Sequence, residues 1–114
     1  MPKFVEAPEF TKDLNKLRKF RTIEEDLEVF KKALAVDPKN LPGVVIISGI
    51  GRGFLPVYKA RKFRCRYLQS TGKIRVIYTY NAPTDEITLI EIYFKGQNEN
   101  HNPDRIKKYA IKIQ

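Results

Sequence analysis

The spacing of apolar residues changes abruptly around residues 38–43, and this change limits what the chain can fold into. Before this segment, apolar side chains recur every three or four positions, as in amphipathic helices. After it, they form short β-branched runs or alternate with polar residues. Helices followed by strands are typical of an α+β domain. A length of 114 residues suits one domain, so we expect residues 1–114 to form a single one.

Two helices are predicted before the change. Residues 8–19 place apolar side chains at positions i, i+4 and i+7, which is the pattern of a short amphipathic helix. The second helix is expected to begin at Thr22, because Thr22 and Glu25 have the spacing of a capping box. Pro38 cannot continue a helix, so this one should end at Asp37.

Three strands are predicted after the change, at residues 57–68, 73–80 and 86–95, and residues 44–47 form a candidate fourth. The short links between the three favour an antiparallel meander. Residues 86–95 are apolar on nearly both sides, so this strand should lie inside the sheet and be covered by helices. The apolar spacing within residues 104–113 predicts a last helix.

The charge balance points to a polyanionic partner. Lys and Arg number 22 against 13 acidic residues, which gives a formal net charge of +9. Such an excess suits nucleic acid, an anionic membrane surface or an acidic protein. No apolar run is long enough to span a membrane, and the N-terminus does not resemble a signal peptide, so we expect a cytoplasmic location without membrane insertion. One cysteine and one histidine predict neither a disulfide framework nor a zinc site, and we expect no metal or small-molecule cofactor.

The most informative stretch is residues 57–75. It contains no acidic residue and seven cations, namely Lys59, Arg61, Lys62, Arg64, Arg66, Lys73 and Arg75. The cations occupy both odd and even positions, so either a β-bulge changes the phase or the strand protrudes as an edge ribbon. Lysines that guard a sheet edge are one explanation. Arginines interleaved with Tyr58, Phe63 and Tyr67 fit RNA better, because guanidinium groups bind phosphates and aromatic rings stack on bases.

Three further features are weaker candidates. His101 is either a solvated loop residue or a proton-transfer group, since histidine titrates near neutral pH. Glu91 is either a base or the salt-bridge partner of a neighbour such as Arg75. The glycine-rich residues 49–53 lack the ending of a phosphate-binding P-loop and are predicted to be a connection.

Four segments in this order resemble the RelE/ParE toxin family, in which the toxin acts within a type II toxin–antitoxin system. They are the first helix at residues 10–17, the basic strand at 57–66, the strand at 72–78 with Gly72, Arg75, Val76 and Tyr78, and residues 90–96. The resemblance covers residues 8–110. It implies two N-terminal helices packed on a curved antiparallel sheet of three to four strands, with a short C-terminal helix. It also implies an acidic cognate antitoxin that wraps around the toxin.

The resemblance further implies an activity. Ribosome-dependent members of the family are endoribonucleases that cut messenger RNA on the ribosome by attack of the 2′-hydroxyl on the adjacent phosphate, without a metal. Carried over by position, the catalytic candidates in this sequence are Arg75, His101, Arg61 and Lys59. The RNA-binding candidates are Arg64, Arg66, Lys62, Lys73, Lys95 and Tyr109.

The sequence departs from the family at two places. Lys95-Gly96-Gln97 stands where nuclease members have a histidine or glycine followed by arginine. Tyr109 comes late, in a segment whose periodicity also suits a core residue. Two alternatives therefore stay open, a ParE-like poison of DNA gyrase without nuclease activity and an inactive relative that binds RNA or an antitoxin.

Overall fold

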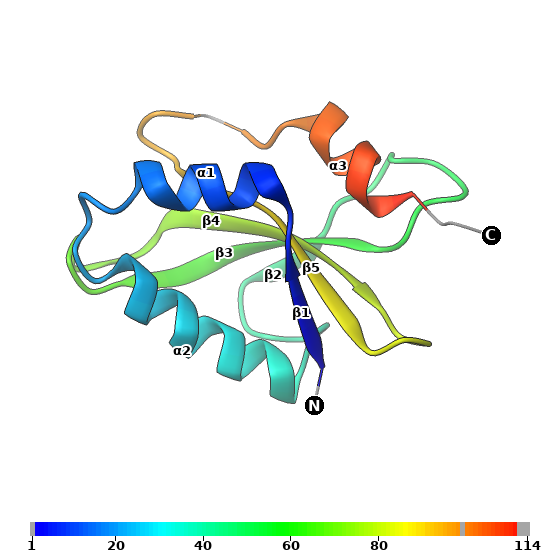
Figure 1. The fold of residues 1–114 in the computed structure, drawn as a ribbon, viewed down its shortest axis with the longest axis horizontal. Coiled ribbons are helices and arrows are strands. Elements are labelled where there is room, and N and C mark those ends of the chain that lie inside the picture. Colours follow the sequence, from blue (N-terminus) through cyan, green and yellow to red (C-terminus); the bar gives the residue numbers. More distant parts are fainter. Residues whose placement is uncertain (1, 99, 112–114) are drawn as a thin grey trace.

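The fold is a twisted five-stranded sheet with three helices (Figure 1). The computed structural model describes residues 2–98 and 100–111. In chain order the elements are β1 (Lys3–Glu6), α1 (Pro8–Lys16), α2 (Ile23–Val36), β2 (Val44–Ile46), β3 (Val57–Cys65), β4 (Ser70–Asn81), β5 (Glu86–Phe94) and α3 (Pro103–Ala110). The strand order across the sheet is β1-β5-β4-β3-β2. The predicted α+β class is confirmed, but β1 comes before the two predicted helices and was not predicted.

The sheet has one strand more than the predicted three to four, and it is mixed. β1 pairs in parallel with β5, where Lys3 lies opposite Glu86 and Glu6 opposite Leu89. The other three strand pairs are antiparallel, as predicted. β1 escapes recognition because its four residues show no clear alternation and its partner strand lies at the other end of the chain. Its pairing gives β5 a neighbour on both sides, so β5 is an interior strand, as expected.

The second helix ends before Pro38, but its predicted capping box does not form. The Thr22 hydroxyl donates to Asp26 at 2.7 Å and accepts from the backbone N–H of Tyr67 at 2.9 Å. Thr22 therefore joins α2 to the turn after β3 rather than capping the helix. No helix within the described residues is long and apolar enough to cross a membrane.

Two apolar cores lie on opposite faces of the sheet. α1 and α2 cover the larger core, whose central side chains include Phe10, Leu27 and Tyr78. The smaller core contains Ile77 and Tyr93 of the sheet and is covered by α3, through Ile106 and Ala110, and by part of the loop after β2. α3 ends at Ala110, and Ile113 of the predicted last helix lies outside the described residues.

A β-bulge interrupts the basic strand β3. The pairing with β4 changes register between Ala60 and Phe63, so that both side chains face the α1–α2 core although they are three positions apart. The bulge alternative of the sequence analysis is thus confirmed. On the partner strand Gly72 has a φ of +108°, and a Cβ there would lie 2.9 Å from the carbonyl oxygen of Arg61. A glycine is therefore required where β4 passes the bulge.

Candidate functional site

The face of the sheet that carries α3 also carries a set of polar side chains from three adjacent strands. Lys59 on β3 and Glu91 on β5 both lie opposite Ile77 of β4, so the three side chains form one row across the sheet. The next row along β4 contains Arg75, which lies opposite Tyr93. The register of β3, β4 and β5 therefore brings together side chains that are far apart in sequence.

Arg61, Arg75 and Lys95 lie close enough to Lys59 for their charges to act on its ammonium group, and we call these four cations the cationic cluster. Burial lowers the pKa of Lys59 below its ordinary value, and the positive charges of Arg75, Lys95 and Arg61, in that order, lower it further. None of the four forms an ion pair with an acidic residue in the described part of the chain. Like charges held this close favour the binding of a polyanion.

The loop after β5 brings His101 onto the cluster. The Lys59 ammonium donates to Asn100 Oδ1 at 3.1 Å and lies 3.4 Å from His101 Nδ1. Burial lowers the pKa of His101, and the charge of Lys59 lowers it further, so the imidazole is neutral near pH 7. Because an ammonium group has only donors, Nδ1 is the acceptor and Nε2 carries the proton. Two predicted catalytic residues, 42 positions apart, are therefore in contact.

Arg75 is half-buried in the middle of the cluster. Its Nε donates to the carbonyl oxygen of Gly72 at 2.8 Å, which fixes the side chain beside the bulge. Within the described residues no hydrogen bond uses its two terminal nitrogens. These are the atoms with which a guanidinium group binds a phosphate. Lys73, a predicted RNA-binding residue two positions before Arg75 on β4, is exposed. Its carbonyl oxygen accepts a hydrogen bond from the backbone N–H of Lys95.

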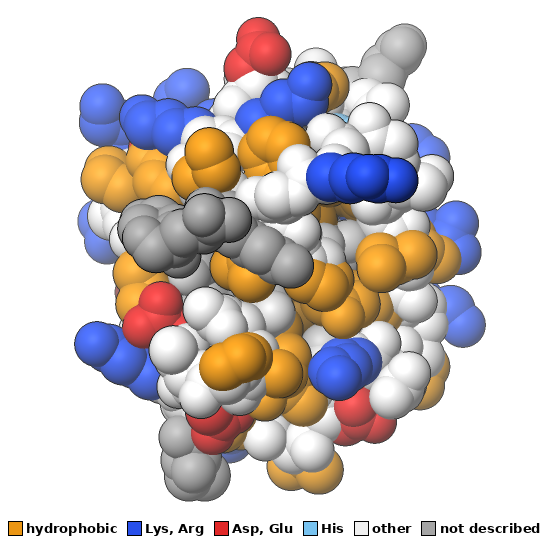
Figure 2. All heavy atoms as spheres, turned by 90° about the vertical axis from the view of Figure 1, so that its right-hand side faces the viewer, with side chains coloured by type: hydrophobic (Ala, Val, Ile, Leu, Met, Phe, Trp, Pro, Cys, Tyr) orange, Lys and Arg blue, Asp and Glu red, His pale blue; other side chains and the backbone are white. Residues whose placement is uncertain are grey.

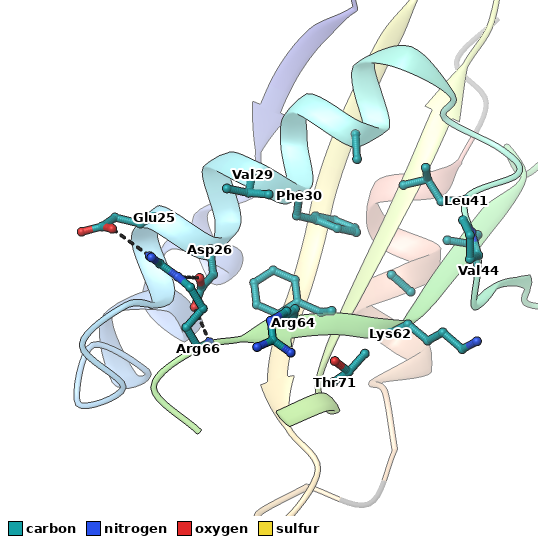
Figure 3. Close-up of a pocket in the computed structure, with 14 residues that line it drawn as sticks. Glu25, Asp26, Val29, Phe30, Leu41, Val44, Lys62, Arg64, Arg66 and Thr71 are labelled. Atoms are coloured by element: carbon teal, nitrogen blue, oxygen red, sulfur yellow. Dashed lines mark hydrogen bonds and ion pairs between the residues drawn. The ribbon is translucent and has the colours of Figure 1, made fainter. Parts of the chain in front are cut away.

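Arg66, predicted to bind RNA, is engaged elsewhere. Its Nε donates to Asp26 at 2.7 Å and its Nη2 to Glu25 at 2.8 Å (Figure 3). Asp26 is buried, which raises its pKa, but the hydrogen bonds from Arg66 and Thr22 outweigh this effect and leave the pKa below its ordinary value. Arg66 therefore braces the end of β3 against α2 and lies outside the cationic cluster.

Lys62 and Arg64 lie at a second surface, the α2–β3 groove (Figure 3). This groove separates α2 from the open edge of β3 and has a volume of about 670 Å³. Its apolar lining consists of Val29, Phe30, Ala33, Leu41, Pro42, Val44, Ala60 and Phe63. Lys62 and Arg64 border it, and neither forms an ion pair with a described acidic residue. The bulge thus divides the basic stretch between two surfaces.

Comparison with known proteins supports the predicted architecture. No protein-family model and no curated protein matches the sequence. Among solved structures, the archaeal RelE–RelB complex from Pyrococcus horikoshii OT3 contains a chain with a TM-score of 0.61 and 22% identity, and the match covers 84% of this chain and 97% of that one. The chain has a RelE-like fold. A metal-bound toxin from Helicobacter pylori also matches, with a TM-score of 0.58, 15% identity, and coverage of 86% and 99%.

Two further residues of this RelE-like fold make structural contacts. Tyr109 on α3 packs against both cores, and its hydroxyl donates to the Glu9 carboxylate, so the described contacts are those of a structural residue. Glu91 forms no salt bridge with Arg75. It lies opposite Ile77 instead, and its carboxylate accepts a hydrogen bond from the backbone N–H of Asn102 at 2.9 Å.

Sequence reasoning missed two members of the site. Asn100 binds the Lys59 ammonium, and Tyr93 offers its ring to the same group, with 6.0 Å between Nζ and the ring centroid. Asn100 stands in a polar loop with several similar residues, so only its position beside His101 could have singled it out. Tyr93 carries the apolar pattern of an interior strand, which gives no sign of a polar neighbour.

The rest of the described chain lacks a metal-ligand group and shows mixed charges at one end (Figure 2). The side chains described include no group of three or more His, Cys, Asp or Glu placed to hold a metal ion. Figure 2 shows the end of the molecule that lies to the right in Figure 1. There apolar side chains separate individual Lys and Arg residues, and acidic side chains lie among them. This mixture of charges contrasts with the cationic cluster.

Proposed function

We propose that this protein is the toxin of a type II toxin–antitoxin system and that it cleaves messenger RNA on the ribosome. The observation that carries the proposal is the contact between Lys59 and His101 inside a cluster of cations that forms no ion pair with an acidic residue in the described part of the chain. A phosphodiester backbone matches that charge, and a lysine beside a neutral histidine supplies a proton donor and a proton acceptor. The RelE-like fold agrees with this class of protein.

The proposed reaction is the attack of a 2′-hydroxyl on the adjacent phosphate. The 2′ oxygen forms a bond to phosphorus while the bond to the 5′ oxygen breaks, which leaves a cyclic phosphate and a 5′-hydroxyl. One proton leaves the 2′ oxygen and another reaches the departing 5′ oxygen, and we assign both transfers to the pair of Lys59 and His101. Arg75 and Arg61 neutralise the negative charge that builds on the phosphate in the transition state.

We further propose that an acidic cognate antitoxin silences the protein. The net charge of +9 suits an acidic partner. The α2–β3 groove adds an apolar floor with Lys62 and Arg64 at its border, and this combination fits an amphipathic segment with acidic flanks. A toxin that acts on translating ribosomes works in the cytoplasm, and we place it there.

The test is toeprinting of translating ribosomes incubated with the purified protein, beside the same message without ribosomes. We expect cuts only in ribosome-bound message. We also expect cleavage to weaken as salt rises, because cations that bind phosphates displace counterions from the nucleic acid. If folded protein gives no cuts in either sample, the nuclease proposal fails. The protein is then a gyrase poison or an inactive relative, and supercoiling and antitoxin-binding assays distinguish these two alternatives.

A further inference from the structure

Glu91 is the buried acid on the face of the cationic cluster, and its position needs an explanation. It lies in the middle of β5 with 3% of its surface exposed, beside the apolar Ile77 and Ile90. Burial raises its pKa, which means that the surroundings oppose the charged form. An aliphatic residue there would avoid the desolvation of a carboxyl group. The sheet alone therefore does not account for a glutamate.

The carboxylate anchors the loop that carries His101. Glu91 Oε1 accepts a hydrogen bond from the backbone N–H of Asn102 at 2.9 Å. The Asn102 side chain in turn caps α3, since its Oδ1 accepts from the backbone N–H groups of Asp104 at 3.1 Å and Arg105 at 3.2 Å. Asn102 is thus held by the sheet through its backbone and by the helix through its side chain.

The residue on the other side of His101 is held as well. Asn100 Oδ1 accepts from the Lys59 ammonium at 3.1 Å and from the backbone N–H of His101 at 3.0 Å. His101 therefore lies between two anchored asparagines, with Nδ1 3.4 Å from Lys59 Nζ. If the hydrogen bond from Asn102 to Glu91 were lost, the loop would keep its cap on α3 but lose its described hydrogen bond to the sheet at Asn102.

We propose that Glu91 is a positioning residue, which holds His101 against Lys59 by anchoring the backbone of Asn102. The catalytic meaning of this arrangement rests on the proposed nuclease function, but the positioning itself does not. Because the contact with Lys59 fixes Nδ1 as the acceptor, Glu91 also helps to fix the tautomer of the imidazole.

The charged groups around Glu91 and His101 come from three elements. Arg105 of α3 and Lys59 of β3 favour the Glu91 carboxylate, and Asp13 of α1 opposes it. His101 responds to burial and to Lys59, both of which lower its pKa. A histidine released into solvent would return to an ordinary pKa of about 6.5. The pKa of His101 therefore reports whether the imidazole still lies on Lys59.

The chain contains a single histidine, so NMR can follow its titration without ambiguity. We expect the His101 pKa to lie below the ordinary value in the wild type and to rise toward it in Glu91→Leu, which cannot accept the hydrogen bond. Glu91→Gln keeps an acceptor oxygen and should keep the pKa low. The Asn102 amide should exchange with solvent faster in the Leu variant than in the Gln variant.

Asp26→Asn is the matched control, because Asp26 is also a buried carboxylate but lies on α2, where it binds Arg66. It should leave the His101 titration unchanged. A folded Glu91→Leu protein with the wild-type His101 pKa would overturn the proposal, as would an equal shift in Asp26→Asn. If the Leu variant does not fold, the test can be made on the wild type. The chemical shift of the Asn102 amide must then change as Glu91 ionises, and an unchanged shift would refute the anchor.

These measurements need no RNA, so they separate the positioning role from the activity. A protein that cuts no message but shows the expected His101 titration would contradict the proposed function alone. If the protein cuts ribosome-bound message, Glu91→Gln should retain cleavage and Glu91→Leu should lose it together with the wild-type pH profile. Full cleavage by a folded Leu variant would show that Glu91 does not position the site.

Discussion

Arg66 and Arg75 are the same residue type in one β-hairpin, yet their surroundings have opposite character. Arg66 is bound to the carboxylates of Asp26 and Glu25, whereas Arg75 has cations as its charged neighbours and a single hydrogen bond to the Gly72 carbonyl. An arginine with two acidic partners has little left to offer a ligand. The availability of a basic residue thus depends on which acids the fold brings to it, and the local sequence does not reveal this.

The difference extends to the two faces of the sheet. The acids of α2 lie toward the groove side of β3, where they bind Arg66, while the described part of the opposite face offers the cluster only the buried Glu91. The bulge between Ala60 and Phe63 separates the two sets of cations. We therefore expect substitutions on the two faces to affect different properties, namely activity on one and stability or partner binding on the other.

The largest effect is expected from Arg75→Ala. Loss of a group that neutralises transition-state charge typically lowers a rate by roughly 10²- to 10³-fold, and we expect this decrease in the cleavage of ribosome-bound message. The thermal midpoint should change little, because the side chain makes one hydrogen bond to the backbone. Lys12→Ala, an exposed cation on α1, is the control and should leave cleavage unchanged. Retained cleavage in folded Arg75→Ala would remove this arginine from the mechanism.

Asp26→Asn should show the reverse pattern. Hydrogen bonds to a charged group contribute about 1.5–3 kcal/mol each, so we expect a loss of stability of about that size in urea denaturation and cleavage close to wild type. Glu24→Gln, which breaks the exposed pair with Arg18, is the control and should change stability by less than about 1 kcal/mol. Equal destabilisation by both variants would show that the buried pair has no special role.

The sequence predicted what depends on local pattern. The spacing of apolar residues identified α1, α2 and the three long strands, and Pro38 marked the end of α2. The position of His101 beyond β5 suggested a site residue, but its contact with Lys59 depends on a loop that lacks periodicity. The pairing of β1 with β5 and of Arg66 with Asp26 joins distant parts of the chain, so no local pattern contains either. The capping-box prediction at Thr22 failed because a tertiary contact with Tyr67 replaced the local one.

The role of the α2–β3 groove can be tested independently of the cationic cluster with Val29→Glu. Val29 is 65% exposed and lines the groove, so a glutamate there should repel an acidic antitoxin segment without disturbing the core. We expect antitoxin affinity to fall about tenfold or more, which corresponds to about 1.4 kcal/mol, with cleavage unchanged. Val36→Glu is the control on the same helix, since Val36 is 87% exposed and does not line the groove. Equal affinity of the two variants in calorimetry would place the antitoxin elsewhere.

The smallest expected effect concerns two buried carboxylates on opposite faces of the sheet, whose contributions to folding stability should depend on pH in opposite directions. Asp26 has a lowered pKa, so its contribution to stability is complete above its ordinary pKa of 3.8 and disappears as the pH falls through the lower folded value. Glu91 has a raised pKa, so the folded state binds the proton more tightly than the unfolded state. Its contribution is therefore complete below the ordinary value of 4.5 and is lost as the pH rises through the folded value.

Urea midpoints of the wild type and of each variant, measured between pH 3 and pH 8, should reveal these opposite pH dependences when the variant's curve is subtracted from the wild-type curve. Glu91→Gln cannot titrate, so relative to the wild type it should gain stability as the pH rises above 4.5. Asp26→Asn should lose less stability than the wild type as the pH falls below 3.8. Parallel curves for the wild type and Glu91→Gln would mean that the Glu91 carboxyl titrates as it does in solvent. The buried anchor beneath His101 would then be absent, whereas the brace between Asp26 and Arg66 on the other face would stand.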